Sequence, residues 1–108
     1  MGMINMERIR ELSDQIARAF EPERIILFGS HAYGTPTNDS DVDLLVILSF
    51  EGHNTGKAVE IMNEINPRIP VDLVVRTPEE VRRRLALNDF FLREIVEKGK
   101  VLYESAHS

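Results

Sequence analysis

Three aspartates stand where two apolar runs of the sequence begin, and together they could bind divalent metal ions. Asp41 and Asp43 are separated by one residue and open the run that ends at Leu48, while Asp72 opens a similar run in the segment PVDLVV. Successive side chains of a strand point to opposite faces, so Asp41 and Asp43 would share one face. Asp72 would approach them laterally if its strand lay beside theirs. Ligand sets made only of oxygen favour Mg²⁺, or Mn²⁺, over zinc or copper.

This arrangement suits a two-metal phosphoryl transfer, in which two ions stabilise the attacking and the leaving oxygen. In that scheme Asp41 and Asp43 bridge both ions. Asp72 holds the ion that activates the attacking hydroxyl, and it accepts the proton. The alternative is that the D-x-D pair belongs to a turn, a place where aspartate is common. Asp72 weakens this alternative, because a second apolar strand then begins with an acid that neither burial nor strand propensity requires.

A glycine–serine pair precedes the aspartates and could bind phosphate. Gly29 and Ser30 follow the apolar run Arg24–Phe28, and the residues from Ser30 to Tyr33 are predicted to form the first turn of a short helix. Glycine lets the backbone approach a ligand, a helix N-terminus offers N–H groups to an anion, and the serine hydroxyl adds a donor. The pair would therefore hold the β- and γ-phosphates of a nucleoside triphosphate. The alternative is a capped turn without a ligand, since neither G-x-x-x-x-G-K-[ST] nor G-x-G-x-x-G occurs.

Composition bounds the kind of protein that carries these residues. A chain of 108 residues with 43% hydrophobic and 29% charged residues is expected to form one domain over residues 1–108. Its longest apolar run, Leu44–Leu48, is too short to cross a bilayer and no secretory signal is visible, so a cytoplasmic protein is expected. The absence of cysteines excludes disulfides and thiolate metal sites. The net charge of -5 argues against binding long nucleic acid through its phosphates.

Hydrophobic periodicity and turn residues predict an alternation of helices and strands. Helices are expected over residues 6–20, 57–65, 77–87 and 88–98, and strands over residues 24–28, 43–48, 71–75 and 100–103. Thr77 is the predicted cap of the third of these helices, and Gly99 the C-terminal cap of the fourth. The link between the first two strands contains no long helix, so they need not be parallel. The pattern indicates an α/β (α+β) fold with a small mixed β-sheet flanked by helices.

Two further clusters have ordinary structural interpretations. The aromatic segment Phe90–Leu92, together with Ile95, could belong to the core or could cover a partner protein. The core is the better interpretation, because exposed apolar patches are uncommon in monomers. The arginine run at positions 82–84 is interpreted as a solvated helix face.

The motifs described above resemble the nucleotidyltransferase signature of the DNA polymerase β superfamily. That signature is G-S-x-A-x-G, a spacer, S-D-x-D-L-x-V and a later strand aspartate. The residues that match it are Gly29, Ser30, Ala32, Gly34, Ser40, Asp41, Asp43, Leu44, Val46 and Asp72. Chain length and the order of elements resemble the small members of the superfamily, the minimal nucleotidyltransferase (MNT) domains. A nucleotidyltransferase-like fold is therefore implied.

The resemblance implies transfer of a nucleoside monophosphate, expected to be AMP from ATP, to an acceptor hydroxyl with release of pyrophosphate. It implies Asp41, Asp43 and Asp72 as ligands of two Mg²⁺ ions, and Gly29 and Ser30 as the phosphate cradle. MNT proteins are often encoded beside a HEPN-domain protein that resembles an RNase toxin, with the MNT protein as antitoxin. Some of these antitoxins transfer AMP onto a tyrosine of the toxin. A HEPN-domain toxin is therefore the expected partner, with a homo- or hetero-oligomeric state left open.

Two departures from the family pattern bear on activity. Many relatives carry arginine at the position of Tyr33, so the triphosphate charge would have to be met elsewhere, with Arg24 and Lys57 as the available cations. Larger relatives also carry a helical domain that binds the base or the acceptor, and 108 residues leave no room for one. Two alternatives stay open. One is an inactive module that neutralises its partner by occlusion, and the other is a transferase that acts on RNA or on a small molecule.

Overall fold

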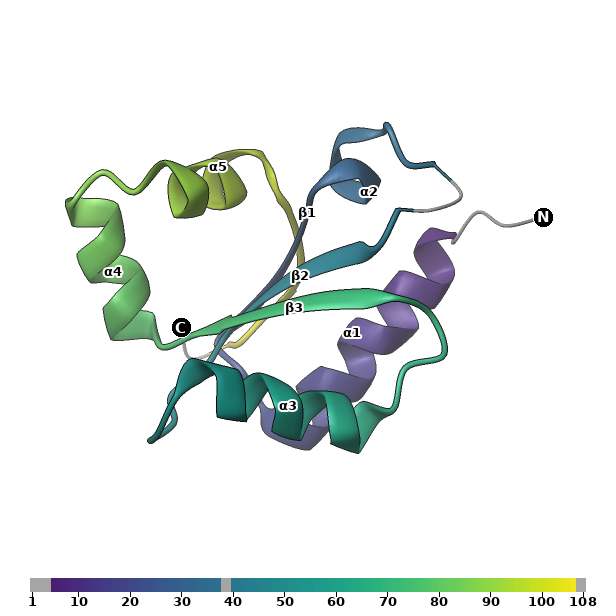
Figure 1. The fold of residues 1–108 in the computed structure, drawn as a ribbon, viewed down its shortest axis with the longest axis horizontal. Helices are drawn as coiled ribbons and strands as arrows, with labels where there is room; N and C mark the ends of the chain where they lie inside the picture. The colour runs from purple at the N-terminus through teal and green to yellow at the C-terminus, as the bar shows by residue number, and fades with distance from the viewer. Residues whose placement is uncertain (1–4, 38–39, 107–108) are drawn as a thin grey trace.

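Four strands of the described chain form one sheet with helices on both faces (Figure 1). The computed structural model describes residues 5–37 and 40–106. Along these residues the elements follow in the order α1 (Met6–Phe20), β1 (Arg24–Phe28), α2 (Ser30–Tyr33), β2 (Val42–Ile47), α3 (Asn54–Ile65), β3 (Val71–Arg76), α4 (Pro78–Ala86), α5 (Phe90–Lys98) and β4 (Lys100–Glu104). Each predicted helix and strand is present, with ends that differ from the prediction by up to three residues.

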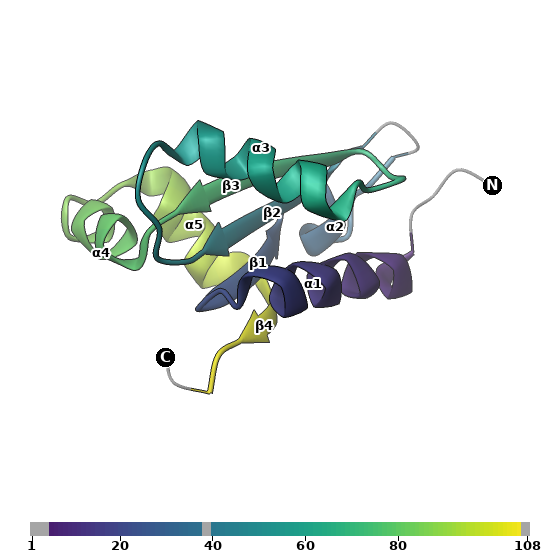
Figure 2. The same ribbon diagram turned by 90° about the horizontal axis from the view of Figure 1, so that it is seen from below.

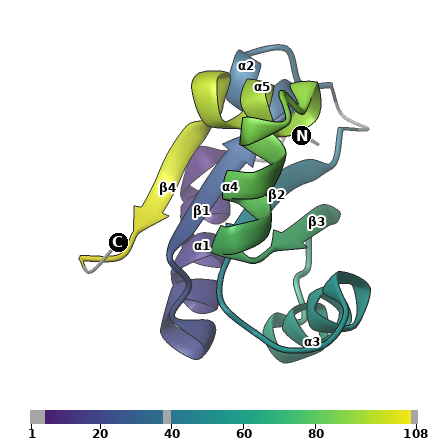
Figure 3. The same ribbon diagram turned by 90° about the vertical axis from the view of Figure 1, so that its left-hand side faces the viewer.

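The strand order across the sheet is β3-β2-β1-β4, with β3 and β4 at the two edges (Figure 3). Strand β1 is antiparallel to both β2 and β4, whereas β2 and β3 are parallel. A parallel pair needs a crossover, and α3 supplies it between β2 and β3. In its described part, the link from β1 to β2 carries the short helix α2, and an antiparallel pair needs no longer crossover. The predicted mixed sheet is confirmed.

Both faces of the central strands are apolar, because helices cover each of them. One face packs against α1 and α3, which lie next to each other on that side (Figure 2). The strand residues buried on this face are Ile25, Leu27, Val42, Leu44, Val46 and Val75. The opposite face packs against α4 and α5. The strand residues buried there are Ile26, Phe28, Leu45 and Ile47.

Two glycines mark the start of α3 and the end of α5. Helix α3 begins at Asn54 and takes Gly56 into its first turns, so it starts earlier than the predicted position 57. Gly99 is the C-cap of α5, as predicted, and its N–H donates to the carbonyl oxygen of Ile95 at 2.8 Å, although its φ of -71° is not left-handed. A Cβ at Gly99 would lie 2.6 Å from Cγ2 of Ile26 and 2.9 Å from the carbonyl oxygen of Leu27. Close packing of α5 on β1 therefore explains this glycine.

Side-chain caps fix where α4 and α5 begin. The hydroxyl oxygen of Thr77 accepts a hydrogen bond from the N–H of Glu80 at 3.2 Å, as its sequence context predicts. Oδ1 of Asp89 accepts one from the N–H of Leu92 at 3.1 Å. Among residues 5–37 and 40–106, no helix has the length and apolar character needed to cross a membrane.

Replacing Asp89 with alanine is expected to lower the melting temperature in a pH-dependent way. The N–H groups of Leu92 and Phe91, and then the charge of Arg84, hold the pKa of Asp89 below its ordinary value of 3.8. A carboxyl with a lowered folded-state pKa stabilises the fold above its unfolded pKa, and this stabilisation is lost as pH falls through the folded pKa. Thermal melts of wild type and Asp89→Ala should therefore differ at pH 7 and converge in strong acid. Glu94→Ala, on the exposed side of α5, is the control, and a difference that persists unchanged in acid would contradict the assignment.

Candidate active site

Asp43 and Asp72 lie next to each other on adjacent strands. Strands β2 and β3 pair in a register that sets Asp43 opposite Asp72. Adjacent strands are about 4.8 Å apart, so the two side chains leave the same face of the sheet side by side. This is the α4–α5 face, because the neighbouring Val42 and Leu44 point into the core on the other side. Asp43 is partly buried and Asp72 is exposed.

Asp41 lies immediately before β2, at the same end of the sheet. The strand begins at Val42, whose N–H donates to the carbonyl oxygen of Pro70 at 2.9 Å. This hydrogen bond holds the backbone next to Asp41 against the backbone that leads into β3. The negative charge of Asp41 acts on Asp43. All three predicted aspartates thus lie at one end of the sheet, where β2 and β3 begin.

The electrostatics at this end of the sheet oppose ionisation of Asp43. Burial raises the pKa of Asp43 above its ordinary value of 3.8, and the charges of Asp72 and then Asp41 raise it further. The positive charge of His31 acts in the opposite direction. Two carboxylates about 5 Å apart repel each other by roughly 3 kcal/mol at an effective dielectric constant near 20. A cation bound between these groups would remove the cost.

The donor set fits a hard divalent cation, although the side chains do not form a ready-made cage. Among residues 5–37 and 40–106, no three histidine, cysteine, aspartate or glutamate side chains are grouped so that they could hold a metal ion. The oxygen donors of Asp41, Asp43 and Asp72 are nevertheless those that Mg²⁺ prefers. Magnesium also takes many of its ligands from water and substrate phosphates, so it does not require a closed protein cage. Metal binding by the three aspartates stays a prediction.

The glycine of the glycine–serine pair is required by its contact with Asp43. Gly29 has φ 74° and ψ -162°, a conformation that is essentially restricted to glycine. A Cβ at Gly29 would collide with Oδ2 of Asp43 and would lie 3.0 Å from its Cγ. The missing side chain lets the backbone that precedes α2 pass directly against the Asp43 carboxylate. The predicted phosphate turn and the predicted metal ligand therefore share one small volume.

Ser30 begins the short helix that the sequence predicted. The N–H groups of Ala32 and Tyr33 donate to the carbonyl oxygen of Gly29 at 3.0 and 3.1 Å. Gly34, with φ 82°, ends the helix and donates its N–H to the carbonyl oxygen of Ser30. Helix α2 packs on β1 and β2, and Ser30 stays partly exposed. Phosphate binding by Gly29 and Ser30 stays a prediction.

His31 is a residue of this site that sequence reasoning missed. Its Nε2 lies 3.2 Å from the carbonyl oxygen of Ser40. A carbonyl oxygen only accepts, so Nε2 carries the proton and donates it. This hydrogen bond ties α2 to the residue that precedes Asp41, and the charge of His31 lowers the pKa of Asp43. The available signal in the sequence was its position directly after Ser30, inside the phosphate turn.

Many relatives carry an arginine where this chain has Tyr33, and Arg24 and Lys57 were suggested to replace its charge. Neither of these two cations is at the site. Arg24 is paired with Ile47 at the opposite end of the β1–β2 ladder, and its guanidinium binds Glu104 at 3.1 Å. Lys57 lies on α3, which covers the other face of the sheet, and its ammonium is 3.3 Å from Glu60. The suggestion was wrong, because strand direction and the choice of face were not known from the sequence. Among the residues described, His31 supplies the positive charge that acts on Asp43.

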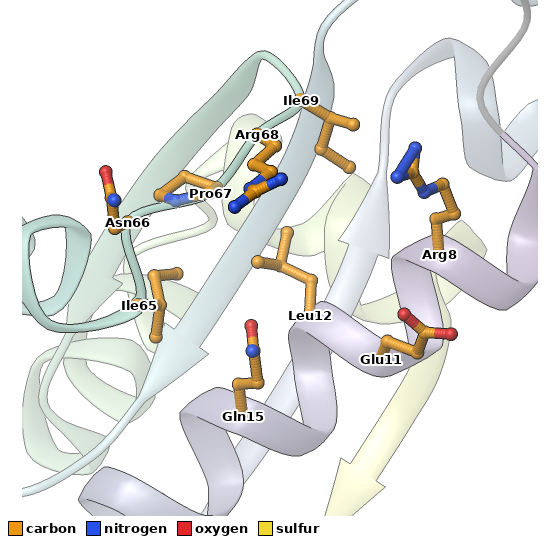
Figure 4. A pocket seen from close by; sticks show the side chains of 9 residues that line it. All are labelled: Arg8, Glu11, Leu12, Gln15, Ile65, Asn66, Pro67, Arg68 and Ile69. Carbon is orange, nitrogen blue, oxygen red and sulfur yellow. The ribbon is translucent and has the colours of Figure 1, made fainter.

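A cavity of about 350 Å³ lies between α1 and the link from α3 to β3 (Figure 4). Leu12 and Ile65 line its apolar part, and Arg8 and Arg68 are among its polar walls. The aspartates are not among its lining residues. Because α1 and α3 cover the face opposite Asp43 and Asp72, this cavity is separate from the candidate active site.

Comparison with known proteins agrees with this geometry. The family model described as "Nucleotidyltransferase domain" matches residues 9–103. A protein of Methanocaldococcus jannaschii named "Putative protein adenylyltransferase MJ0604" is 28% identical over 85 residues, which cover 75% of this chain and 78% of that protein.

Solved structures share the arrangement of elements. The crystal structure of "a putative nucleotidyltransferase from Sulfolobus solfataricus" has a TM-score of 0.57 at 25% identity, over 71% of this chain and 70% of that chain. A crystal structure of "the toxin-antitoxin with AMP-PNP" has a TM-score of 0.57 at 23% identity, over 96% of this chain and 77% of that chain, and shows the fold alone. The predicted nucleotidyltransferase-like fold is confirmed.

Proposed function

The chain belongs to the nucleotidyltransferase domain family, and from this premise we propose that it transfers AMP from ATP to a hydroxyl group of a partner protein. The observation that carries the proposal is the placement of Asp43 beside Asp72 in register, with Gly29 packed against Asp43. These three residues join the phosphate turn to the carboxylates that nucleotide transfer requires.

In the proposed reaction the oxygen of the acceptor hydroxyl attacks the α-phosphorus of ATP. The bond from this phosphorus to the bridging oxygen breaks, and pyrophosphate leaves with the electron pair. Asp72, the exposed member of the strand pair, accepts the hydroxyl proton on a carboxylate oxygen. Ser30 and the backbone N–H groups at the start of α2 orient the β- and γ-phosphates. Mg²⁺ held by Asp41, Asp43 and Asp72 would neutralise charge on the phosphates.

The proposed acceptor is a protein, and a HEPN-domain toxin is the proposed partner. One relative is named as a protein adenylyltransferase, and one structural relative is a toxin–antitoxin solved with AMP-PNP, an analogue of ATP. The net charge of -5 disfavours a long nucleic acid as acceptor. In this proposal the chain is an antitoxin that silences its partner by AMPylation.

A transfer assay with purified HEPN partner, Mg²⁺ and ATP labelled at the α-phosphorus tests this function. Label should move to the partner with the wild-type chain. Asp72→Asn should reduce the rate by roughly 100-fold or more, because loss of a general base costs about 10²–10⁴-fold. The control is Asp14→Asn, which removes one exposed carboxylate from α1 on the other face of the sheet.

The same assay separates AMPylation from neutralisation by occlusion. If the wild type moves no label, and Asp72→Asn still neutralises the partner, the occlusion alternative replaces the proposed function. One observation favours keeping this second candidate: the described carboxylates are not grouped as a finished metal site.

A further inference from the structure

Three large apolar side chains are exposed at the corner between α4 and α5. Leu87 is 76% exposed, Phe90 79% and Phe91 50%. The prediction that the aromatic segment belongs to the core is therefore wrong for Phe90 and Phe91, although it is right for Leu92, which is buried. Helix α5 packs on the sheet through Leu92, so Phe90, two residues earlier, faces solvent. We call Leu87, Phe90 and Phe91 the aromatic corner.

The aromatic corner is linked to the candidate active site through Phe91. The ring of Phe91 meets the ring of Phe28 edge-on, with the two centroids 5.6 Å apart. Phe28 is in turn the strand partner of Asp43. Helix α5 packs on β1, and both α5 and α2 lie at the end of β1 that carries Phe28 (Figures 1 and 3). A molecule that contacts Phe91 would therefore lie on the side of the protein where Phe28 is paired with Asp43.

Several local contacts define the backbone of the corner. Asn88 adopts the left-handed conformation with φ 66°, and this sets the turn between the two helices. Asp89 caps α5 and also lies 3.5 Å from the guanidinium of Arg84 on α4. Leu92 and Ile95 anchor α5 in the core. These contacts define the backbone of the corner, from which the rings of Phe90 and Phe91 reach the surface.

A basic border accompanies this apolar patch. Arg83 precedes Leu87 by one helical turn, so the two side chains lie on the same side of α4. The N–H of Leu87 donates to the carbonyl oxygen of Arg83, which extends that turn to the corner. Arg82 and Arg83 are both exposed. The chain as a whole has a net charge of -5, so this positively charged border is a local feature. It favours a partner that carries carboxylates beside an apolar segment.

We propose that the aromatic corner is the docking surface for the acceptor protein, which binds through an apolar segment flanked by aspartate or glutamate. This inference rests on the proposed function for the identity of the occupant. The three side chains expose roughly 400 Å² together, a patch size that is often functional on monomers. That is about half of the 800 Å² that one partner buries in a standard interface, so flanking polar contacts such as Arg83 complete it.

Binding of the HEPN partner, measured by calorimetry without ATP, tests the docking surface apart from catalysis. The double variant Leu87→Ser/Phe90→Ser should raise the Kd at least 10-fold, while its Kd for ATP stays at the wild-type value. Arg83→Glu should also weaken partner binding and should reduce its dependence on salt. The matched controls are Val59→Ser, which is 53% exposed on α3, and Arg10→Glu on α1. Neither control should change the Kd.

The outcomes of binding and transfer distinguish the two proposals. If label reaches the partner, and the double variant binds it and modifies it like wild type, the docking surface is overturned while the function stands. If wild type binds the partner without transferring label, and the double variant does not bind it, the docking surface is supported and the proposed function is overturned. A wild-type chain that does not bind the partner overturns the docking surface. A concentration-dependent dimer that the double variant abolishes also overturns it, because a second copy is then the occupant.

Discussion

Replacing Asp43 with asparagine is expected to abolish nucleotide transfer and, at the same time, to raise the stability of the metal-free protein at pH 7. The two effects have one cause. Asp43 is partly buried beside Asp72 and near Asp41, and burial followed by these two charges raises its pKa. Asparagine keeps the size of the side chain and removes its charge. The unfavourable burial and repulsion disappear together with the ability to neutralise a cation.

The size of the catalytic loss can be bounded from below. Mutation of a residue that only orients a metal ligand lowers metal affinity or activity by about 10–100-fold. A group that contacts the ion itself should cost more, so transfer by Asp43→Asn should fall by more than roughly 100-fold. The transfer assay with labelled ATP measures this loss. Asp14→Asn, on the far face, should keep the wild-type rate.

The stability effect has a defined sign and pH window. A carboxyl with a raised folded-state pKa gives stability that is fully present below its unfolded pKa of about 3.9 and is lost as pH rises through the folded pKa. Wild type and Asp43→Asn should therefore be closest near pH 3.5, and the variant should gain on wild type up to pH 7. Melting temperatures in EDTA across this range measure the difference. A variant that melts below wild type at pH 7 would show that Asp43 is not under electrostatic strain.

Metal addition provides a readout that is independent of activity. A cation that binds only the folded state raises the melting temperature by an amount that grows with the ratio of its concentration to its Kd. Mg²⁺ should stabilise wild type more than Asp43→Asn. At high Mg²⁺ concentration, wild type should therefore have the higher melting temperature of the two. Equal shifts for both proteins would remove Asp43 from the proposed ligand set.

The sequence was sufficient for the local features of this site, because each of them depends on short-range patterns. The D-x-D spacing and the apolar run after it identified a strand that begins beside Asp41. Apolar runs of similar length identified β1 and β3, and the short β1–β2 link indicated a mixed sheet. Thr77 identified the start of α4 through a capping pattern that acts within one helical turn.

Features that depend on contacts between distant residues could not be predicted in the same way. The pairing of Asp43 with Asp72 depends on the register between β2 and β3, which no local pattern fixes. His31 and Ser40 are nine residues apart in the chain, so their hydrogen bond depends on how α2 packs beside the start of β2. Phe90 was assigned to the core because exposed apolar patches are uncommon in monomers, but the packing of α5 on β1 buries Leu92 and leaves Phe90 exposed. In each case the missing information was the packing partner.

Gly29→Ala is expected to lower the stability of the protein and to abolish nucleotide transfer. Alanine at φ 74° and ψ -162° costs about 1–3 kcal/mol in backbone strain. Its Cβ would also collide with the carboxylate of Asp43, which must move to make room. We therefore expect a lower free energy of unfolding together with loss of transfer activity. Urea denaturation and the labelled-ATP assay measure the two effects.

Gly34→Ala separates strain from collision, because Gly34 has φ 82° but a Cβ there would meet no atom within 4 Å. It should lose stability through strain alone and should keep most of its activity. A double-mutant cycle with Asp43→Ala isolates the collision, since that variant removes the carboxylate that a Cβ at Gly29 would strike. Gly29→Ala should cost less stability in the Asp43→Ala background than in wild type, by roughly 0.5–3 kcal/mol. Gly34→Ala should cost the same in both backgrounds. A coupling energy near zero for Gly29 and Asp43 would mean that the turn and the carboxylate do not share the volume on which the proposed chemistry depends.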